Sequence, residues 1–224
     1  MKDRLRPPHA GVMTTNTGRG ARPGDQTQTA ADLETEWAAD PRWSDVTRDY
    51  TSARLRTEGV FDQKYGRFEA RLKLPRGAGI WPAFWLLGTS HTTRGWPECG
   101  ELDIMELRGS EPGINHGSAH GPGYSGGNPK TASYTLSGGG SFAEDFHVFA
   151  IEWSPGEVHW FVDGDHYHAI RAADMPVEQR WVFDDGPMFV ILNVAVGGWF
   201  GGAVDDSVFP QSMYVDYVRV YARE

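Results

Sequence analysis

Hydrophobic and polar residues alternate one by one along several short stretches of the chain. Residues 66–74 show this most clearly, because each second position is apolar and the positions between carry charge. A period of two places successive side chains on opposite faces of the backbone, which predicts a half-buried β-strand. Apolar runs of strand length follow at residues 146–153, 158–164, 188–196 and 213–221.

The segments between these runs are rich in turn-forming residues. A Ser-Pro-Gly-Glu turn separates the runs at 146–153 and 158–164, which predicts a β-hairpin. The interval 109–140 holds ten glycines and is expected to form surface loops. Only residues 169–181 favour a short helix or turn. Many short strands with little helix predict an all-β fold of two stacked antiparallel sheets with a cleft.

The start of the chain differs from the rest. Residues 1–36 contain no aromatic residue and are rich in Gly, Thr, Arg and Pro, so they offer little apolar surface to offset the entropy of ordering. We expect a flexible leader there. The remaining length suits one all-β domain, since sandwiches of about 200 residues commonly fold as a unit.

Net charge narrows the classes of ligand. The chain carries a formal charge of −9 and a pI near 5.3, which argues against a nucleic-acid or anionic-membrane surface and favours a neutral ligand. The single cysteine, Cys99, excludes an internal disulfide. No apolar run is long enough to span a membrane, and the basic start is not followed by the apolar core of a signal peptide.

Three carboxylates stand at uneven spacing in the stretch GELDIMELRG at 100–109. In a regular strand Glu101 and Asp103 share one face, and Glu106 would point to the other. One extra residue, inserted as a β-bulge at Ile104 or Met105, would return Glu106 to the first face. We expect Met105 to be the residue that the bulge takes up.

With that bulge the two glutamates are suited to one type of chemistry. Their Cα atoms would lie roughly 13 Å apart, and side chains leaning together would bring the carboxyl groups to about 5 Å, the separation used in retaining glycoside hydrolysis. Asp103 between them would raise the proton affinity of a neighbour. A solvated acidic strand face is the alternative that these residues alone leave open.

Several longer blocks carry a family resemblance. The resemblance is carried by the acidic stretch together with the blocks GRFEARLKLPRGAGIWPAFWLLG, HGPGYSGG, FHVFAIEWSPG and VFPQSMYVDYVRVY. The chain resembles glycoside hydrolase family 16, most closely its laminarinase-like endo-1,3-β-glucanases. The resemblance covers residues 50–221. It implies a β-jelly-roll sandwich of two antiparallel sheets with an open concave cleft for a polysaccharide. The extra residue in E-x-D-x-x-E separates the chain from the lichenase type.

The resemblance also implies roles for individual residues. Glu101 matches the nucleophile of a retaining mechanism, Asp103 the assisting acid and Glu106 the acid/base, with no cofactor needed for catalysis. The substrate-binding positions implied are Trp81, Trp85, Trp96, His120, Asn193 and Trp199. The alternative for any one tryptophan is burial in the core, and for a lone histidine a structural hydrogen bond.

The N-terminal part departs from the family pattern. Residues 1–47 lack the expected strand and acidic segment, so we expect an atypical N-terminal segment, flexible or truncated, followed by a catalytic domain at 48–224. Many relatives bind a structural calcium through an aspartate of the last strand. Asp216 matches that position, and its remaining ligands would come from the N-terminal segment.

The leading hypothesis is therefore an endo-acting hydrolase of β-1,3-glucan, with mixed-linkage β-1,3-1,4-glucan as a further substrate. The alternatives are a non-catalytic β-glucan-binding protein, a truncated pseudoenzyme on the same fold, and a transglycosylase. The partner expected is a β-glucan chain, with no nucleic acid and no membrane, bound by a monomer. The resemblance implies an extracellular protein.

Overall fold

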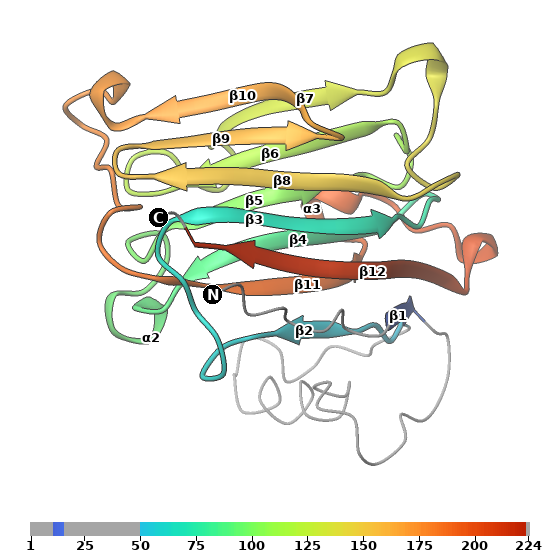
Figure 1. Cartoon of the computed structure of the whole chain (residues 1–224). Coiled ribbons are helices and arrows are strands. Elements are labelled where there is room, and N and C mark those ends of the chain that lie inside the picture. Colours follow the sequence, from blue (N-terminus) through green and yellow to red (C-terminus); the bar gives the residue numbers. More distant parts are fainter. Residues whose placement is uncertain (1–10, 16–49, 223–224) are drawn as a thin grey trace, which may run out of the picture.

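Strands dominate the protein and form two layers. The computed structural model describes residues 11–15 and 50–222 of the chain. Within these residues, twelve strands form two six-stranded sheets in which every neighbouring pair is antiparallel. Figure 1 shows the sheets stacked as two layers. The predicted sandwich of two antiparallel sheets is confirmed.

Each sheet joins strands that are distant in the sequence. The first sheet contains, in spatial order, β1 (Gly11–Thr15), β12 (Gln211–Tyr221), β3 (Gly66–Lys73), β8 (His147–Ser154), β9 (Glu157–Val162) and β10 (Asp165–Arg171). The second sheet contains, in spatial order, β2 (Arg54–Arg56), β11 (Met188–Val196), β4 (Ile80–Gly88), β5 (Glu101–Glu106), β6 (Ile114–His120) and β7 (Lys130–Thr135).

Helical structure is confined to single turns. The α-helical turns are α2 (His91–Arg94) and α3 (Gly198–Gly201), and the 3₁₀ turns are Ser137–Gly139, Ala172–Asp174 and Asp206–Val208. The turn at Ala172–Asp174 lies in the stretch predicted to be helical or turn-like. Across the described residues, no helix has the length and apolar character needed to cross a membrane.

The hydrophobic core lies between the two sheets. Alternate residues of β3 point into it, and Phe68, Ala70 and Leu72 are fully buried. β8 and β9 contribute aromatic rings from the same sheet, including Trp153 and Trp160. Burial of large apolar side chains at about 25 cal/mol per Å² is the main stabilising contribution to such a layer.

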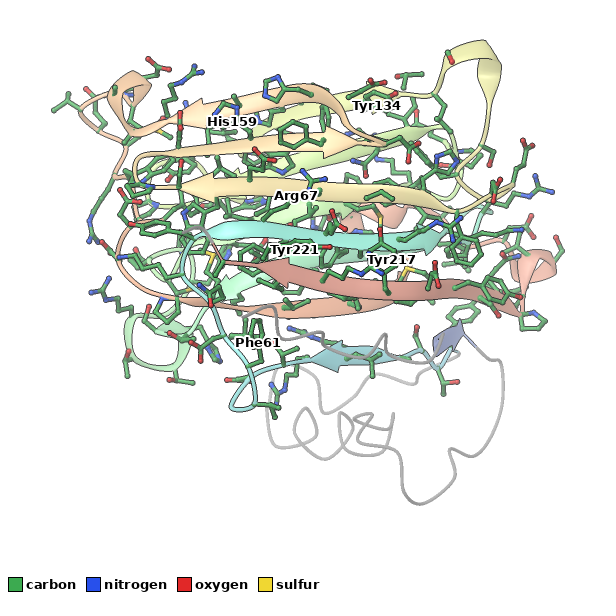
Figure 2. The ribbon with its side chains drawn as sticks, in the orientation of Figure 1. Phe61, Arg67, Tyr134, His159, Tyr217 and Tyr221 are labelled. Atoms are coloured by element: carbon green, nitrogen blue, oxygen red, sulfur yellow. The ribbon has the colours of Figure 1, made fainter. Side chains whose placement is uncertain are left out.

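The outer face of the first sheet is polar and partly aromatic. Figure 2 shows Arg67, His159 and Tyr221 on this side. The Arg67 guanidinium lies 2.8 Å from the Glu69 carboxylate and 3.0 Å from that of Glu152 on the neighbouring strand. Arg67 is therefore paired with a carboxylate on its own strand and with another on the neighbouring strand.

The strands correct one prediction about loops, and one short strand lies in the segment expected to be a leader. β6 and β7 lie in the glycine-rich interval 109–140 that we expected to form loops. β1 lies in the expected leader and pairs with β12, from Gly11 opposite Val215 to Thr15 opposite Gln211. Edge pairing uses backbone hydrogen bonds, which need no apolar side chains. Residues 16–47 lie outside the described part, so the domain boundary at residue 48 stays a prediction.

We expect Gly88→Ala to destabilise the fold. A Cβ at Gly88 would overlap the carbonyl oxygen of Cys99, just where β4 approaches the start of β5. Forcing atoms into a packed backbone contact costs about 1–3 kcal/mol. Thermal unfolding should show a lower Tm for Gly88→Ala. The matched control is Gly127→Ala, because a Cβ there meets nothing within 4 Å; equal Tm values for the two variants would contradict the close approach.

Candidate active site

Strand β5, at the centre of the second sheet, contains a one-residue bulge. On β4, Phe84 pairs with Met105 and the next residue, Trp85, pairs with Asp103, so Ile104 has no partner there. The bulge expected at Ile104 or Met105 is therefore present. The extra residue is Ile104 and not Met105, because Met105 keeps its place opposite Phe84.

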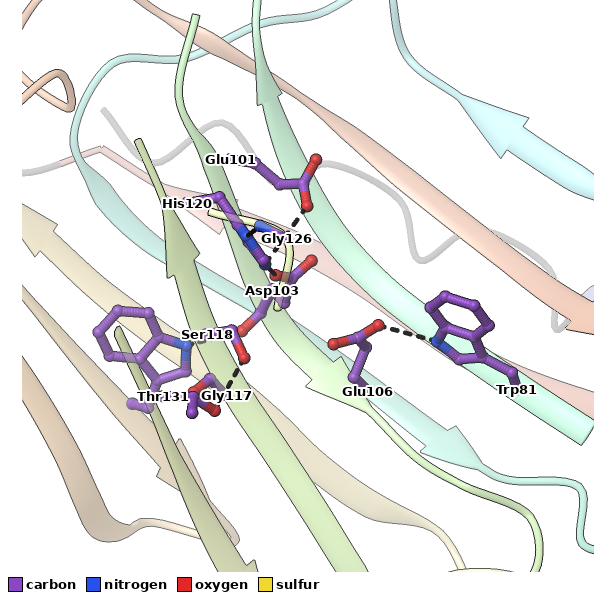
Figure 3. A network of polar contacts seen from close by, with 10 residues as sticks. Trp81, Glu101, Asp103, Glu106, Gly117, Ser118, His120, Gly126 and Thr131 are labelled. Carbon is purple, nitrogen blue, oxygen red and sulfur yellow. Dashed lines mark hydrogen bonds and ion pairs between the residues drawn. The ribbon is translucent and has the colours of Figure 1, made fainter. Parts of the chain in front are cut away.

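The bulge changes which side chains face the core. Leu102, Ile104 and Met105 are all fully buried, so two consecutive residues point inward. Glu106 then returns to the outer face, where Glu101 and Asp103 also lie. Figure 3 shows the three carboxylates as one row.

A row of polar residues on β6 lies directly opposite the carboxylates. Glu101 pairs with His120, Asp103 with Ser118, and Glu106 with His116. Direct pairing on one face brings side chains into contact distance. No carboxylate of β5 therefore faces another carboxylate across this pair of strands.

Sequence analysis missed His116 and Ser118. Both belong to the stretch His-Gly-Ser-Ala-His at 116–120, which alternates with a period of two and ends at His120. That alternation was the available signal for a strand with a polar outer face. The Ser118 hydroxyl donates to Thr131 Oγ1 at 2.9 Å, and His116 Nδ1 lies 3.0 Å from Ser133 Oγ.

His120 contacts two of the carboxylates with one nitrogen. Its Nε2 lies 3.1 Å from Asp103 Oδ2 and 3.7 Å from Glu101 Oε1. Its Nδ1 accepts the backbone N–H of Gly126 at 3.1 Å. A neutral imidazole that accepts at Nδ1 carries its proton on Nε2. His120 therefore presents an N–H to the acidic pair.

This tautomer bears on whether the cluster can hold a metal. Glu101, Asp103 and His120 are the one group of three possible ligands that the described residues bring together. A metal would need the lone pair of His120 Nε2, which carries the proton while Nδ1 accepts from Gly126. The hydrogen bonding of His120 thus favours an acid–base cluster over a metal centre.

The predicted substrate-binding tryptophans on β4 make specific hydrogen bonds. Trp81 Nε1 donates to Glu106 Oε1 at 2.8 Å, as Figure 3 shows. Trp85 Nε1 donates to Asn193 Oδ1 at 2.8 Å. Trp81 therefore orients a carboxylate, and the amide oxygen of Asn193 is already paired.

The other two predicted tryptophans are exposed. Trp96 is 48% exposed, and its ring lies 6.0 Å from that of His120. Trp199 is 70% exposed, with its ring 5.9 Å from that of Trp81. Exposed indole rings thus lie at both ends of the carboxylate row. Trp96 lies beside His120, near Glu101, and Trp199 lies beside Trp81, which binds Glu106.

The chain is similar to known proteins. The family model described as "Glycosyl hydrolases family 16" matches residues 14–219 of the chain. The chain belongs to this family. The match begins at residue 14, within the segment that we expected to be atypical. The resemblance in the sequence was placed from residue 50 onward.

Named relatives and solved structures of family 16 agree with the fold. The chain is 45% identical over 184 residues to a β-glucanase of Rhodothermus marinus, covering 78% of this chain and 63% of that protein. It is 36% identical over 183 residues to glucan endo-1,3-β-glucosidase A1 of Niallia circulans, covering 78% of this chain and 27% of that protein.

The laminarinase catalytic domain of Thermotoga maritima superposes with a TM-score of 0.81 at 45% identity, covering 95% of this chain and 77% of that one. The predicted family and jelly-roll fold are confirmed. The chain spans less than two thirds of the length of both curated relatives.

The calcium position expected from family 16 has another partner. Asp216 lies on β12 in the first sheet, and its carboxylate forms an ion pair with Arg71 at 2.8 Å. Among the described residues, Asp216 is not part of any group of three possible metal ligands. One carboxylate held by an arginine does not provide the six or more oxygen ligands that calcium takes. Most of the N-terminal segment that would supply the other ligands lies outside the described residues, so a calcium site at Asp216 stays a prediction.

Burial makes all three carboxyl groups weaker acids. It raises the pKa of Glu101, helped by the charge of Asp103, and it raises the pKa of Asp103. Burial and the charge of Asp103 raise the pKa of Glu106 to about 8, although the hydrogen bond from Trp81 opposes the shift. The row therefore keeps protons at neutral pH that isolated carboxyl groups would have lost.

We predict that this burial makes stability depend on pH. The pKa of Glu106 is raised from 4.5 to about 8, so its stabilising contribution is complete below pH 4.5 and is lost as the pH rises to 8. Gln cannot ionise and can still accept from Trp81. The free energy of unfolding of Glu106→Gln, relative to the parent protein, should therefore increase over that range, as measured by urea unfolding at a series of pH values.

The control for this measurement is Glu144→Gln, which removes an exposed carboxylate far from the row in sequence. Its difference from the parent protein should change less with pH than that of Glu106→Gln. Parallel curves for the parent protein and Glu106→Gln would show that Glu106 does not bind its proton more tightly in the folded state.

Proposed function

We propose that the chain is an endo-acting, retaining glycoside hydrolase that cleaves β-1,3-glucan. The observation that carries the proposal is the bulge at Ile104, because it brings Glu106 to the face of Glu101 with Asp103 between them. Membership of family 16 and the names of its relatives, β-glucanase and laminarinase, support the same conclusion.

Glu106 acts as the acid in the first step. Its raised pKa keeps the carboxyl group protonated at neutral pH. Trp81 occupies Oε1, so the proton is available on Oε2. Glu106 donates this proton to the glycosidic oxygen as the bond to the anomeric carbon breaks, which allows the sugar to leave as a neutral alcohol.

Glu101 acts as the nucleophile. The raised pKa of Asp103 lets this neighbour hold a proton, which reduces its repulsion of a charged Glu101. The N–H groups of His120 and Trp96 beside Glu101 stabilise that charge on the attacking carboxylate. Its oxygen bonds to the anomeric carbon and forms a glycosyl ester. Glu106, now ionised, then takes a proton from water as the water oxygen displaces Glu101.

A neutral polysaccharide suits the surroundings of the row. The exposed rings of Trp96 and Trp199 offer apolar faces on which pyranose C–H groups can stack. The acidic surface of the chain would repel an anionic polymer. We therefore propose a laminarin-type β-1,3-glucan, with mixed-linkage β-1,3-1,4-glucan as a second substrate, and we place the reaction outside the cell, where such polymers occur.

Two other functions share this scaffold. A glucan-binding protein needs no acid and no nucleophile, so the presence of all three carboxylates with raised pKa values favours catalysis. Transglycosylation uses the same glycosyl ester and differs only in the acceptor, which is a sugar hydroxyl in place of water. Product analysis with and without added oligosaccharide separates these two outcomes.

We predict opposite azide products for the two glutamate variants. Both Glu101→Ala and Glu106→Ala should lose reducing-sugar release from laminarin, the acid variant by about 10²–10⁴-fold. With an activated aryl laminarioside, azide should replace water in Glu106→Ala and give a β-glycosyl azide. In Glu101→Ala it should enter the space of the lost carboxylate and give an α-glycosyl azide. Product anomers are read by NMR.

Glu144→Gln serves as the control and should retain the parent activity. Azide products of the same anomeric form from both alanine variants would contradict the assignment of two different roles. Binding of laminarin by the parent protein without any product would favour the glucan-binding function instead.

A further inference from the structure

We infer that Trp160 is a positioning residue for the proposed reaction, because its indole N–H holds the bulge that sets Glu106. Trp160 lies on β9 in the first sheet and is fully buried. Its Nε1 donates to the backbone carbonyl oxygen of Asp103 at 2.8 Å, across the interior of the sandwich. The inference rests on the proposed function only for its effect on rate.

The acceptor of this bond lies at the irregular point of β5. The carbonyl of Asp103 belongs to the peptide that leads into Ile104, the residue without a partner on β4. A bulge disrupts the ladder locally and leaves backbone groups to find other partners. A buried carbonyl without a donor is costly, so an N–H arriving from the opposite sheet stabilises the bulged register.

The neighbouring strand leaves space for the indole. On β6, Gly117 lies between the partners of Asp103 and Glu106, directly across from the bulge. A Cβ at Gly117 would lie 2.5 Å from Trp160 Cδ1 and would overlap the hydroxyl of Tyr167. Glycine at 117 is therefore what allows the indole to reach the strand.

The hydroxyl group that also fills this space is itself held in place. Tyr167 lies on β10, and its oxygen accepts from Asn115 Nδ2 at 3.1 Å. Asn115 is fully buried. The hydroxyl of Tyr167 and the indole of Trp160 thus lie together around the space that Gly117 leaves open.

The hydrogen bond from Trp160 matters because it stabilises the register of β5, and register controls which face a side chain occupies. A strand that loses its extra residue turns every following side chain to the other face. Glu106 comes two residues after Ile104, so weakening the bulge moves Glu106 relative to Glu101. Small errors in the placement of a catalytic group reduce the rate more than they reduce binding.

The experiment compares Trp160→Phe with Trp153→Phe. Trp153 is a second core indole of the same sheet, 1% exposed, and its Nε1 has no hydrogen-bond partner. Both variants remove an indole from the core, but only Trp160→Phe removes a donor to β5. We expect kcat on laminarin to fall about 10-fold or more in Trp160→Phe, with KM within about twofold of the parent value, and to change little in Trp153→Phe.

The dependence on leaving group identifies the step affected. An activated aryl laminarioside needs little proton donation from Glu106, so the loss of kcat in Trp160→Phe should be smaller with it than with laminarin. A general loss of folded protein would reduce both rates equally. Equal kcat ratios for Trp160→Phe and Trp153→Phe on laminarin would overturn the inference.

A second variant covers the case in which Trp160→Phe fails to fold. Gly117→Ala should displace the indole and lower kcat on its own. Unchanged kcat in Gly117→Ala would also overturn the inference.

A readout without substrate separates this inference from the proposed function. If the bulge positions Glu106, the pH-dependent stability difference caused by Glu106→Gln should shrink in the Trp160→Phe background and persist in Trp153→Phe. A parent protein that is inactive on laminarin but shows this pattern would sink the proposed function alone. If the effect of Glu106→Gln on stability persists equally in the Trp160→Phe and Trp153→Phe backgrounds, the positioning role is contradicted.

Discussion

The extra residue at Ile104 is the feature on which the active face depends. Side chains alternate strictly along a strand, so no choice of residue types could place positions 101, 103 and 106 on one face without it. The bulge requires two consecutive inward residues, and the core accommodates both Ile104 and Met105 with complete burial. Burial of both residues between the sheets therefore allows the spacing of the carboxylates.

Burial of the row has opposite effects on function and stability. Removing three carboxyl groups from water raises their pKa values, which supplies a proton donor at neutral pH. The same desolvation makes their ionised forms unfavourable in the folded state. The arrangement is tolerated because His120 lies beside Asp103 and Glu101 and because Trp81 donates to Glu106.

The sequence predicted the parts of the site that depend on local spacing. The bulge follows from three acids and the period of a strand, and the alternation in β3 follows from its own residues. β6 was missed because it has an unusual composition for a strand. Its outer face beside the acids is polar, and it has a glycine at 117, where an indole from the other sheet approaches. In composition such a strand resembles a loop.

Contacts between distant strands were beyond the reach of spacing arguments. Nothing near Asp216 in the sequence indicates that Arg71, on the neighbouring strand, takes its carboxylate. The hydrogen bond from Trp160 to Asp103 joins residues 57 positions apart in different sheets. The choice between Ile104 and Met105 as the extra residue also depended on pairing with β4.

The two ends of the row differ in ways that support different proposed roles for two chemically identical side chains. Glu101 lies near N–H groups of both His120 and Trp96, which favour a charged carboxylate. Glu106 receives one N–H, from Trp81, on a single oxygen. That leaves its other oxygen able to hold a proton. Donor placement, more than burial, therefore distinguishes the nucleophile from the acid, since burial raises the pKa of both glutamates.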